Sequence, residues 1–171
     1  MRKEVILKAD KALTDLIQNL SSFDDQQMNK VPFAGSWTPA QIAEHLFKSY
    51  DLTQVLVGNV SETSRPIDQH VKEVSDLFLD FEVKMKSPEF ILPSEEPIDV
   101  KNLMTSLKEK KSQIVELAET LDLTKTCLDF EIPEYGNFTR LEWLYFMIFH
   151  TQRHVHQLSL ISQHATSEVV N

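Results

Sequence analysis

The chain has 171 residues, of which 42% are hydrophobic and only three are glycine, which is typical of one globular domain with a sizeable core. We therefore expect a single domain over residues 1–171. Asp and Glu outnumber Lys and Arg by 26 to 17, and the resulting net charge of −9, with no basic run, disfavours nucleic acid or an anionic membrane as a partner.

The first predicted helix covers residues 4–20, and the segment that follows it is a loop. Apolar residues in the helix recur three or four positions apart and form one face. They are Val5, Ile6, Ala9, Leu13, Leu16, Ile17 and Leu20. Residues 21–36 contain Asp, Asn, Pro and Gly, which discourage regular structure.

The second predicted helix has a clear start. Thr38 is a candidate N-cap, Pro39 occupies the first helical position, and Gln41 stands three residues after the cap. This is a capping-box pattern with proline where its missing N–H does no harm. We expect Trp37 to pack back onto the helix as a staple, and the helix to continue to about Val57.

A long connector over residues 59–97 precedes the third helix. Residues 70–86 can form a short helix within it, and a connection of this length is typical of a segment that closes over something or contains short elements. The third helix is predicted over residues 99–121 with Asp99 as its cap. Residues 122–137 are predicted to be a second connector.

The last predicted helix begins after Thr139, with Glu142 as the reciprocal capping-box residue, and runs to about Gln163. Its first turns, residues 143–149, are apolar all round, so this helix is either central or faces a partner subunit. Four long helices with two long connectors predict an all-α four-helix bundle.

Cysteine usage and hydropathy indicate the compartment. Cys127 is the only cysteine, so no internal disulfide forms, which suits a reducing cytosol. No apolar run approaches the ~20 residues of a membrane-spanning helix, and the first ten residues lack the apolar stretch of a signal peptide. We expect a soluble cytoplasmic protein.

Three histidines fall within seven residues of the last helix. His150 and His154 are four apart and lie one turn above each other, so both imidazoles can reach one point. His156 is six residues from His150 and points elsewhere. Such a pair also occurs by chance, with neighbouring hydroxyls or water as its hydrogen-bond partners.

His45, the only histidine of the second helix, favours a metal site, because it lies near the core-facing stripe. Three core-directed histidines would each need separate hydrogen-bond partners, whereas one divalent ion satisfies all three. His164 lies ~15 Å along the helix from His154, too far to share an ion. We expect His70 to be a surface residue.

The chain resembles a known family in two segments. One is T-P-x-x-I-x-x-H-L after a tryptophan, and the other is G-x-x-T-R-x-E-W followed by H-T-x-x-H-x-x-Q-L. The matching residues are Trp37, Thr38, Pro39, Ile42, His45 and Leu46, then Gly136, Thr139, Arg140, Glu142, Trp143, His150, His154, Gln157 and Leu158. Together they resemble the DinB/YfiT-like superfamily of metal-binding four-helix bundles.

This resemblance implies an up-down-down-up bundle with His45, His150 and His154 as the metal ligands. Relatives in that superfamily include thiol-dependent S-transferases, a mycothiol-dependent maleylpyruvate isomerase and proteins labelled metal-dependent hydrolases. The implied cofactors are a divalent metal and a low-molecular-weight thiol, and the implied partner is a small-molecule substrate.

Three imidazoles leave a coordination position open, as in catalytic zinc sites, whereas structural zinc sites are closed by four protein ligands. Imidazole suits Zn, Ni, Cu or Fe, and we expect Zn or Ni. Gln157, one turn past His154, is the candidate to hold its other ring nitrogen.

We expect other polar and aromatic residues near the histidines to have structural roles. Glu44 points away from His45 and should be solvated or salt-bridged, and Glu142 should serve the helix cap. Arg153 should form a surface ion pair, with anion binding as the second choice. We expect Tyr50 and Trp37 to belong to the core.

Two functions are open at this point. The leading hypothesis is a metal-dependent transferase or hydrolase in which the ion activates a bound thiol or water. The alternative is a non-catalytic bundle that binds a metal, a small ligand or a partner subunit, because no general base or other catalytic residue is identifiable. A homodimer is compatible with either hypothesis.

Overall fold

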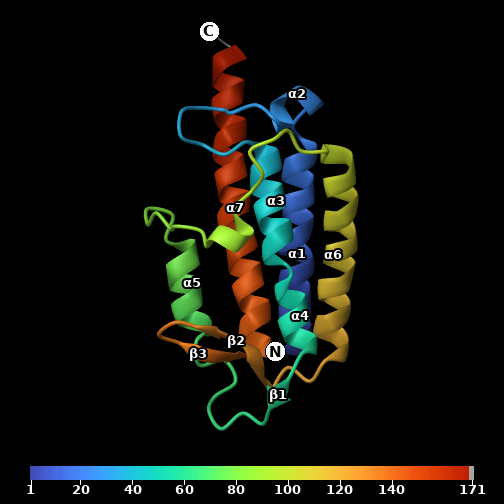
Figure 1. Cartoon of the computed structure of the whole chain (residues 1–171), viewed down its shortest axis with the longest axis vertical. Coiled ribbons are helices and arrows are strands. Elements are labelled where there is room, and N and C mark those ends of the chain that lie inside the picture. Colours follow the sequence, from blue (N-terminus) through green and yellow to red (C-terminus); the bar gives the residue numbers. More distant parts are fainter. Residues whose placement is uncertain (170–171) are drawn as a thin grey trace.

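The computed structural model describes residues 1–169, and four long helical segments lie side by side in it along one axis (Figure 1). They are α1 (Arg2–Ser21), α3 (Pro39–Ser49) with its continuation α4 (Leu52–Val57), α6 (Val100–Thr120) and α7 (Arg140–Val169). Helix α1 packs against α6 and α7, and α3 packs against the same two helices. The predicted four-helix bundle is therefore confirmed.

Contacts between helix ends give the helix directions. The Arg2 guanidinium at the start of α1 donates to backbone carbonyls at the end of α6, those of Ala118, Glu119 and Leu121. Lys8 lies 5.3 Å from the ring centroid of Tyr145, near the start of α7. Arg140 at the start of α7 donates to the Leu56 carbonyl of α4. Thus α1 and α7 run in one direction, and α3–α4 and α6 run in the other (Figure 1).

Side-chain caps begin the second and third long helices as predicted. The Thr38 hydroxyl accepts from the Gln41 N–H, and the Gln41 side chain accepts from the Thr38 N–H, at 3.1 and 3.0 Å. Asp99 accepts from the N–H of Asn102 at 3.1 Å. Each bond satisfies an N–H group that the helix itself leaves without a partner.

The second helix does not continue unbroken to Val57, as expected from the sequence; it breaks between α3 and α4. The hydroxyls of Ser49 and Thr53 donate to the carbonyls of Leu46 and Tyr50, each three residues back. Such back-bonding competes with the helical pattern, which accounts for the break here. His45 lies one turn before the break, in the regular helix α3.

The all-α prediction is incomplete, because a three-stranded antiparallel sheet lies at one end of the bundle (Figure 1). Its strands, in the order β1-β2-β3, are β1 (Val60–Ser61), β2 (Thr126–Ile132) and β3 (Gly136–Thr139). The second predicted connector is therefore a hairpin. Its turn places Glu134 and Gly136 at positive φ, 74° and 77°.

A period of two in the sequence accounts for this hairpin. Leu128, Phe130 and Ile132 alternate with two carboxylates, as strand residues on opposite faces do. The Pro-Glu-Tyr-Gly segment that follows contains the residues that favour a turn. The hairpin leads directly into α7 and so fixes where that helix begins.

Besides strand β1, the long connector contains two short elements, as its length suggested. They are α5 (Val71–Leu79), which packs against α7, and the 3₁₀ turn η1 (Glu89–Ile91), which contacts α3. The predicted helix within residues 70–86 is thus confirmed over its first half. A further single turn, α2 (Asp25–Met28), interrupts the predicted loop after α1.

Helix α7 is central to the bundle, because it packs against α1, α3, α4 and α5. Its apolar first turns are covered within the chain itself, and Trp143 is fully buried. The sequence left open whether this helix is central or faces a partner subunit, and in the structure it is central. Among residues 1–169, no helix combines the length and apolarity that crossing a membrane requires.

Candidate metal centre

His45 of α3 meets His150 and His154 of α7 inside the bundle. The Nε2 atom of His150 lies 3.0 Å from that of His45 and 3.1 Å from that of His154. All three side chains are buried, with exposed fractions of 1%, 6% and 8% in chain order. Among the described residues, this is the one cluster of three or more His, Cys, Asp or Glu ligand atoms close enough to hold an ion.

The outer ring nitrogens of His45 and His154 fix the state of the inner ones. Nδ1 of His45 lies 2.9 Å from the Ile91 carbonyl, and Nδ1 of His154 lies 2.9 Å from Oε1 of Gln157. Both oxygens accept hydrogen bonds, so both Nδ1 atoms are protonated and both Nε2 atoms present a lone pair. Both lone pairs face the same atom, Nε2 of His150.

A neutral His150 cannot satisfy both neighbours, since its Nε2 has at most one hydrogen to donate. A cation at the centre of the cluster would satisfy all three lone pairs. Two nitrogens bound at ~2.0–2.1 Å to one ion, with angles from 90° to tetrahedral, lie about 2.9–3.4 Å apart. The two observed distances fall in this range, so the residues fit a divalent metal.

Burial lowers the pKa of each imidazole of the cluster. For His150 the positive charges that His154 and His45 would carry lower the pKa further, and it falls well below 6.5. Burial, followed by the charge that His45 would carry, lowers the pKa of His154 to about 3. The pKa of His45 falls in the same direction, although its bond to Ile91 opposes the shift. At neutral pH the imidazoles are therefore neutral, the form that coordinates metals.

Aromatic rings surround the cluster. The Trp37 ring centroid lies 5.0 Å from that of His45 and 6.5 Å from that of His154, and Phe78 of α5 lies 5.2 Å from His150. Trp37, which the sequence assigned to the core, is partly buried and packs against the core. Its position before the Thr38 cap aims the ring back over the first turns of α3. An apolar surrounding of this kind strengthens electrostatic interactions at the cluster.

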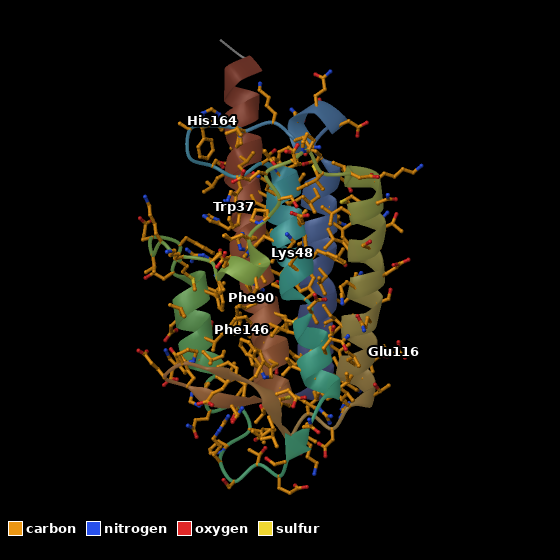
Figure 2. All side chains as sticks on the ribbon, viewed as in Figure 1. Trp37, Lys48, Phe90, Glu116, Phe146 and His164 are labelled. Atoms are coloured by element: carbon orange, nitrogen blue, oxygen red, sulfur yellow. The ribbon has the colours of Figure 1, made fainter. Side chains whose placement is uncertain are left out.

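The remaining histidines lie outside the cluster. The His156 ring stacks on Phe81 with centroids 3.9 Å apart, and His164 contacts Phe33 near the far end of α7 (Figure 2). Both positions agree with the sequence prediction. The expectation of a surface His70 is wrong, because its side chain is 12% exposed and packs against rings of the β2–β3 hairpin.

Glu44 and Arg153 bind backbone groups instead of serving mainly as surface ions. Glu44 accepts from the N–H and the hydroxyl of Ser94 at 2.5 and 2.9 Å, and has only a loose ion pair with Lys48 at 3.4 Å. Burial opposes its ionisation, but the bonds from Ser94 and Lys48 outweigh burial and lower its pKa. Arg153 donates to the carbonyls of Phe78, Asp80 and Val83, and so caps the end of α5.

Glu142 serves the predicted cap and a second role that the sequence did not reveal. Its carboxylate accepts from the Thr139 N–H at 2.8 Å, and Arg65 of the long connector binds both carboxylate oxygens at 2.7 Å. The His70 N–H donates to the same group at 2.9 Å. Tyr50 is fully buried, as predicted, and shares a 2.6 Å hydrogen bond with Thr151.

Two contributors to the site carry no sequence signal. The Ile91 carbonyl is a backbone group that any residue supplies, and Phe78 reaches His150 only because α5 docks on α7. Gln157 did have a signal, its spacing of three from His154, and the structure brings the two side chains together.

Comparisons with known proteins extend this description. Residues 8–158 match the DinB superfamily. The chain is 23% identical over 148 residues to the uncharacterized protein YuaE of Bacillus subtilis (strain 168), covering 84% of this chain and 88% of YuaE.

Two solved structures share the fold. The four-helix bundle protein TT2238 superposes with a TM-score of 0.58 at 17% identity, covering 94% of this chain and 99% of that one. YfiT from Bacillus subtilis, described as a probable metal-dependent hydrolase with an unusual four-helix bundle topology, has a TM-score of 0.59 at 17% identity. That match covers 95% of this chain and 86% of YfiT. The family match spans most of the chain and includes all three clustered histidines, and the chain belongs to the DinB superfamily.

Proposed function

We propose that this protein is a divalent-metal-dependent enzyme whose ion is bound by His45, His150 and His154. The observation that carries the proposal is the pair of Nε2 lone pairs, from His45 and His154, that converge on Nε2 of His150. Neutral, buried imidazoles with bonded outer nitrogens are the arrangement that protein metal sites use. Zn or Ni is the ion we expect, given imidazole ligands alone.

Three protein ligands leave room for a further ligand. When bound, such an ion acts as a Lewis acid and lowers the pKa of a coordinated water or thiol. The surrounding residues of the chain orient the ligands and restrict access of water. The Ile91 carbonyl and Gln157 keep two rings oriented, and the rings of Trp37 and Phe78 limit the water that reaches the cluster.

Water is the nucleophile that we favour, and a low-molecular-weight thiol from solution is the second. The description of YfiT as a probable metal-dependent hydrolase supports the first choice. The chain's own thiol is a poor candidate, because Cys127 is fully buried in β2 and burial raises its pKa to about 11. A thiol reaction would therefore use a second small-molecule substrate, as in a thiol-dependent S-transferase.

The metal content of the purified protein tests the proposed ligands. We expect the wild-type chain, after equilibration with Zn²⁺ or Ni²⁺ and desalting, to retain about one ion per chain. His45→Ala and His154→Ala should lose most of it. His156→Ala is the matched control, since it removes an imidazole of α7 that packs on Phe81 outside the cluster. Equal metal content in all four proteins would refute the assignment.

Activity distinguishes the enzyme from a non-catalytic binding protein. The metal-loaded chain should hydrolyse members of a panel of esters and amides, or transfer small thiols to electrophiles, and a chelator should abolish the turnover. A metal-loaded protein without turnover on any of these substrates would favour the non-catalytic alternative.

A further inference from the structure

A short segment of the long connector is bound along one stripe of α3, beside the histidine cluster. We call this segment, residues 89–94, the strap; it includes η1. Four side chains of α3 bind its backbone or Ser94: Gln41, Glu44, His45 and Lys48, which have the spacing i, i+3, i+4 and i+7. That spacing places all four on one helical face.

Polar contacts rather than apolar burial hold the strap in place. No residue of η1 is fully buried, and the strap side chains Phe90 and Leu92 are 71% and 43% exposed. Phe90 and Lys48 lie on the same side of the bundle in Figure 2. The two backbone bonds that the strap donates, from Ile91 to Pro88 and from Leu92 to Glu89, close only a single turn. The position of the strap therefore depends on the α3 side chains.

Glu44 makes two bonds to the strap, whereas each of the other three side chains makes one. Its two carboxylate oxygens accept separate bonds from Ser94, at 2.5 Å from the N–H and 2.9 Å from the hydroxyl, and its side chain is only 18% exposed. Lys48 adds one bond, to the Leu92 carbonyl at 2.8 Å, and is more exposed, at 34%. Hydrogen bonds that an ionised carboxylate accepts are charge-assisted and are stronger than neutral ones.

The strap in turn supplies the carbonyl that fixes His45. The Ile91 oxygen lies 2.9 Å from Nδ1 of His45, and no other partner of that nitrogen is found among the described residues. Ile91 stands three residues before Ser94, so a strap released from Glu44 would move this carbonyl. His45 would then be free to place its hydrogen on Nε2, where it would block the lone pair that faces His150.

We propose that Glu44 is a positioning residue of the metal centre, acting through Ser94 and the Ile91 carbonyl to keep Nε2 of His45 unprotonated and directed at the cluster. The inference rests on the proposed metal site. It assigns a role to a carboxylate that neither belongs to the cluster nor contacts an ion.

The test uses three variants of the full-length chain. Glu44→Ala removes both bonds to Ser94, and Glu44→Gln retains an acceptor for the Ser94 N–H. Glu116→Ala removes an exposed carboxylate from α6, away from the strap (Figure 2). The first readout is the tautomer of His45 in the metal-free protein, from ¹⁵N chemical shifts of the imidazole. The second is the Co²⁺ dissociation constant with the absorption spectrum of the bound ion.

We expect Glu44→Ala to convert His45 to a mixture of tautomers and to weaken Co²⁺ binding by about 10- to 100-fold, the usual effect of losing a partner of a metal ligand. Glu44→Gln should restore most of the affinity, and Glu116→Ala should match wild type. Ser94→Ala, which deletes one hydroxyl, should shift both readouts in the same direction by less and serves if Glu44→Ala does not fold.

The outcomes separate this inference from the proposed function. If Glu44→Ala keeps the wild-type tautomer, the inference is wrong, whatever the metal affinity. The same holds if Glu44→Ala and Ser94→Ala lower only the melting temperature. If the wild-type chain binds no metal, the proposed function fails, and the tautomer measurement still decides whether Glu44 positions His45.

Discussion

The histidines of the cluster have pKa values below their usual range because their rings are buried. His154 is 8% exposed, and burial together with the neighbouring His45 lowers its pKa from 6.5 to about 3. The unfolded chain has no such environment. Between these two pH values the unfolded state binds a proton that the folded state does not, so folding stability falls as the pH decreases.

We predict that the metal-free protein loses stability as the pH falls below 6.5, before the carboxylates titrate. One such group contributes at most about 1.4 kcal/mol per pH unit to the slope. His154→Gln should reduce the slope, because it removes an imidazole whose pKa burial lowers. Urea unfolding on both sides of pH 6.5 measures this, and identical slopes for wild type and His154→Gln would contradict the prediction.

At the scale of elements, one ion pair with a buried carboxylate joins the long connector to the start of α7. The Glu142 side chain is 0% exposed, and Arg65 binds both of its oxygens. The guanidinium also donates to the Asn137 carbonyl in β3. The connector, the sheet and α7 therefore meet at one carboxylate, which fixes where α7 enters the bundle below His150.

We predict that Arg65→Met destabilises the fold by ~3–5 kcal/mol, because it leaves a buried carboxylate without its charged partner. Lys72→Met is the control: it breaks the Lys72–Asp76 pair, whose side chains are 84% and 64% exposed, and exposed pairs contribute little. The free energy of unfolding in urea measures both. Equal stability of Arg65→Met and Lys72→Met would show that the ion pair does not anchor the connector.

Elements with strong local signals followed from the sequence. The capping boxes at Thr38 and Thr139 and the Asp99 cap are local bonds, so the sequence alone indicates where these helices begin. The β2–β3 hairpin was missed although residues 128–132 alternate, because a short segment between long helices resembles a connector.

At the scale of the whole molecule, the proposed ion links two helices that are distant in sequence. His45 comes from α3 and the other two ligands from α7, which runs in the opposite direction. A ligand that binds only the folded state stabilises it in proportion to the logarithm of its concentration. We therefore expect bound metal to stabilise the packing of α3 against α7.

We predict that Zn²⁺ or Ni²⁺ at ~100 times its dissociation constant stabilises the chain by ~2.7 kcal/mol, a rise in Tm of about 5–10 °C. His45→Ala should lose most of this shift, since α7 alone supplies the remaining pair. Scanning calorimetry with and without chelator measures the effect. A metal-independent Tm in the wild-type protein would contradict a site that bridges the two helices.

The sequence by itself determined the bundle, the helix starts and the three candidate histidines, because helical periodicity, caps and i, i+4 spacing are local properties. Only the tertiary structure decided what surrounds those histidines. The Ile91 carbonyl, the Glu44–Ser94 contact and the Arg65–Glu142 pair join residues 46, 50 and 77 positions apart. Contacts at such separations depend on how the connector folds back over α3 and α7, and no local pattern in the chain encodes that path.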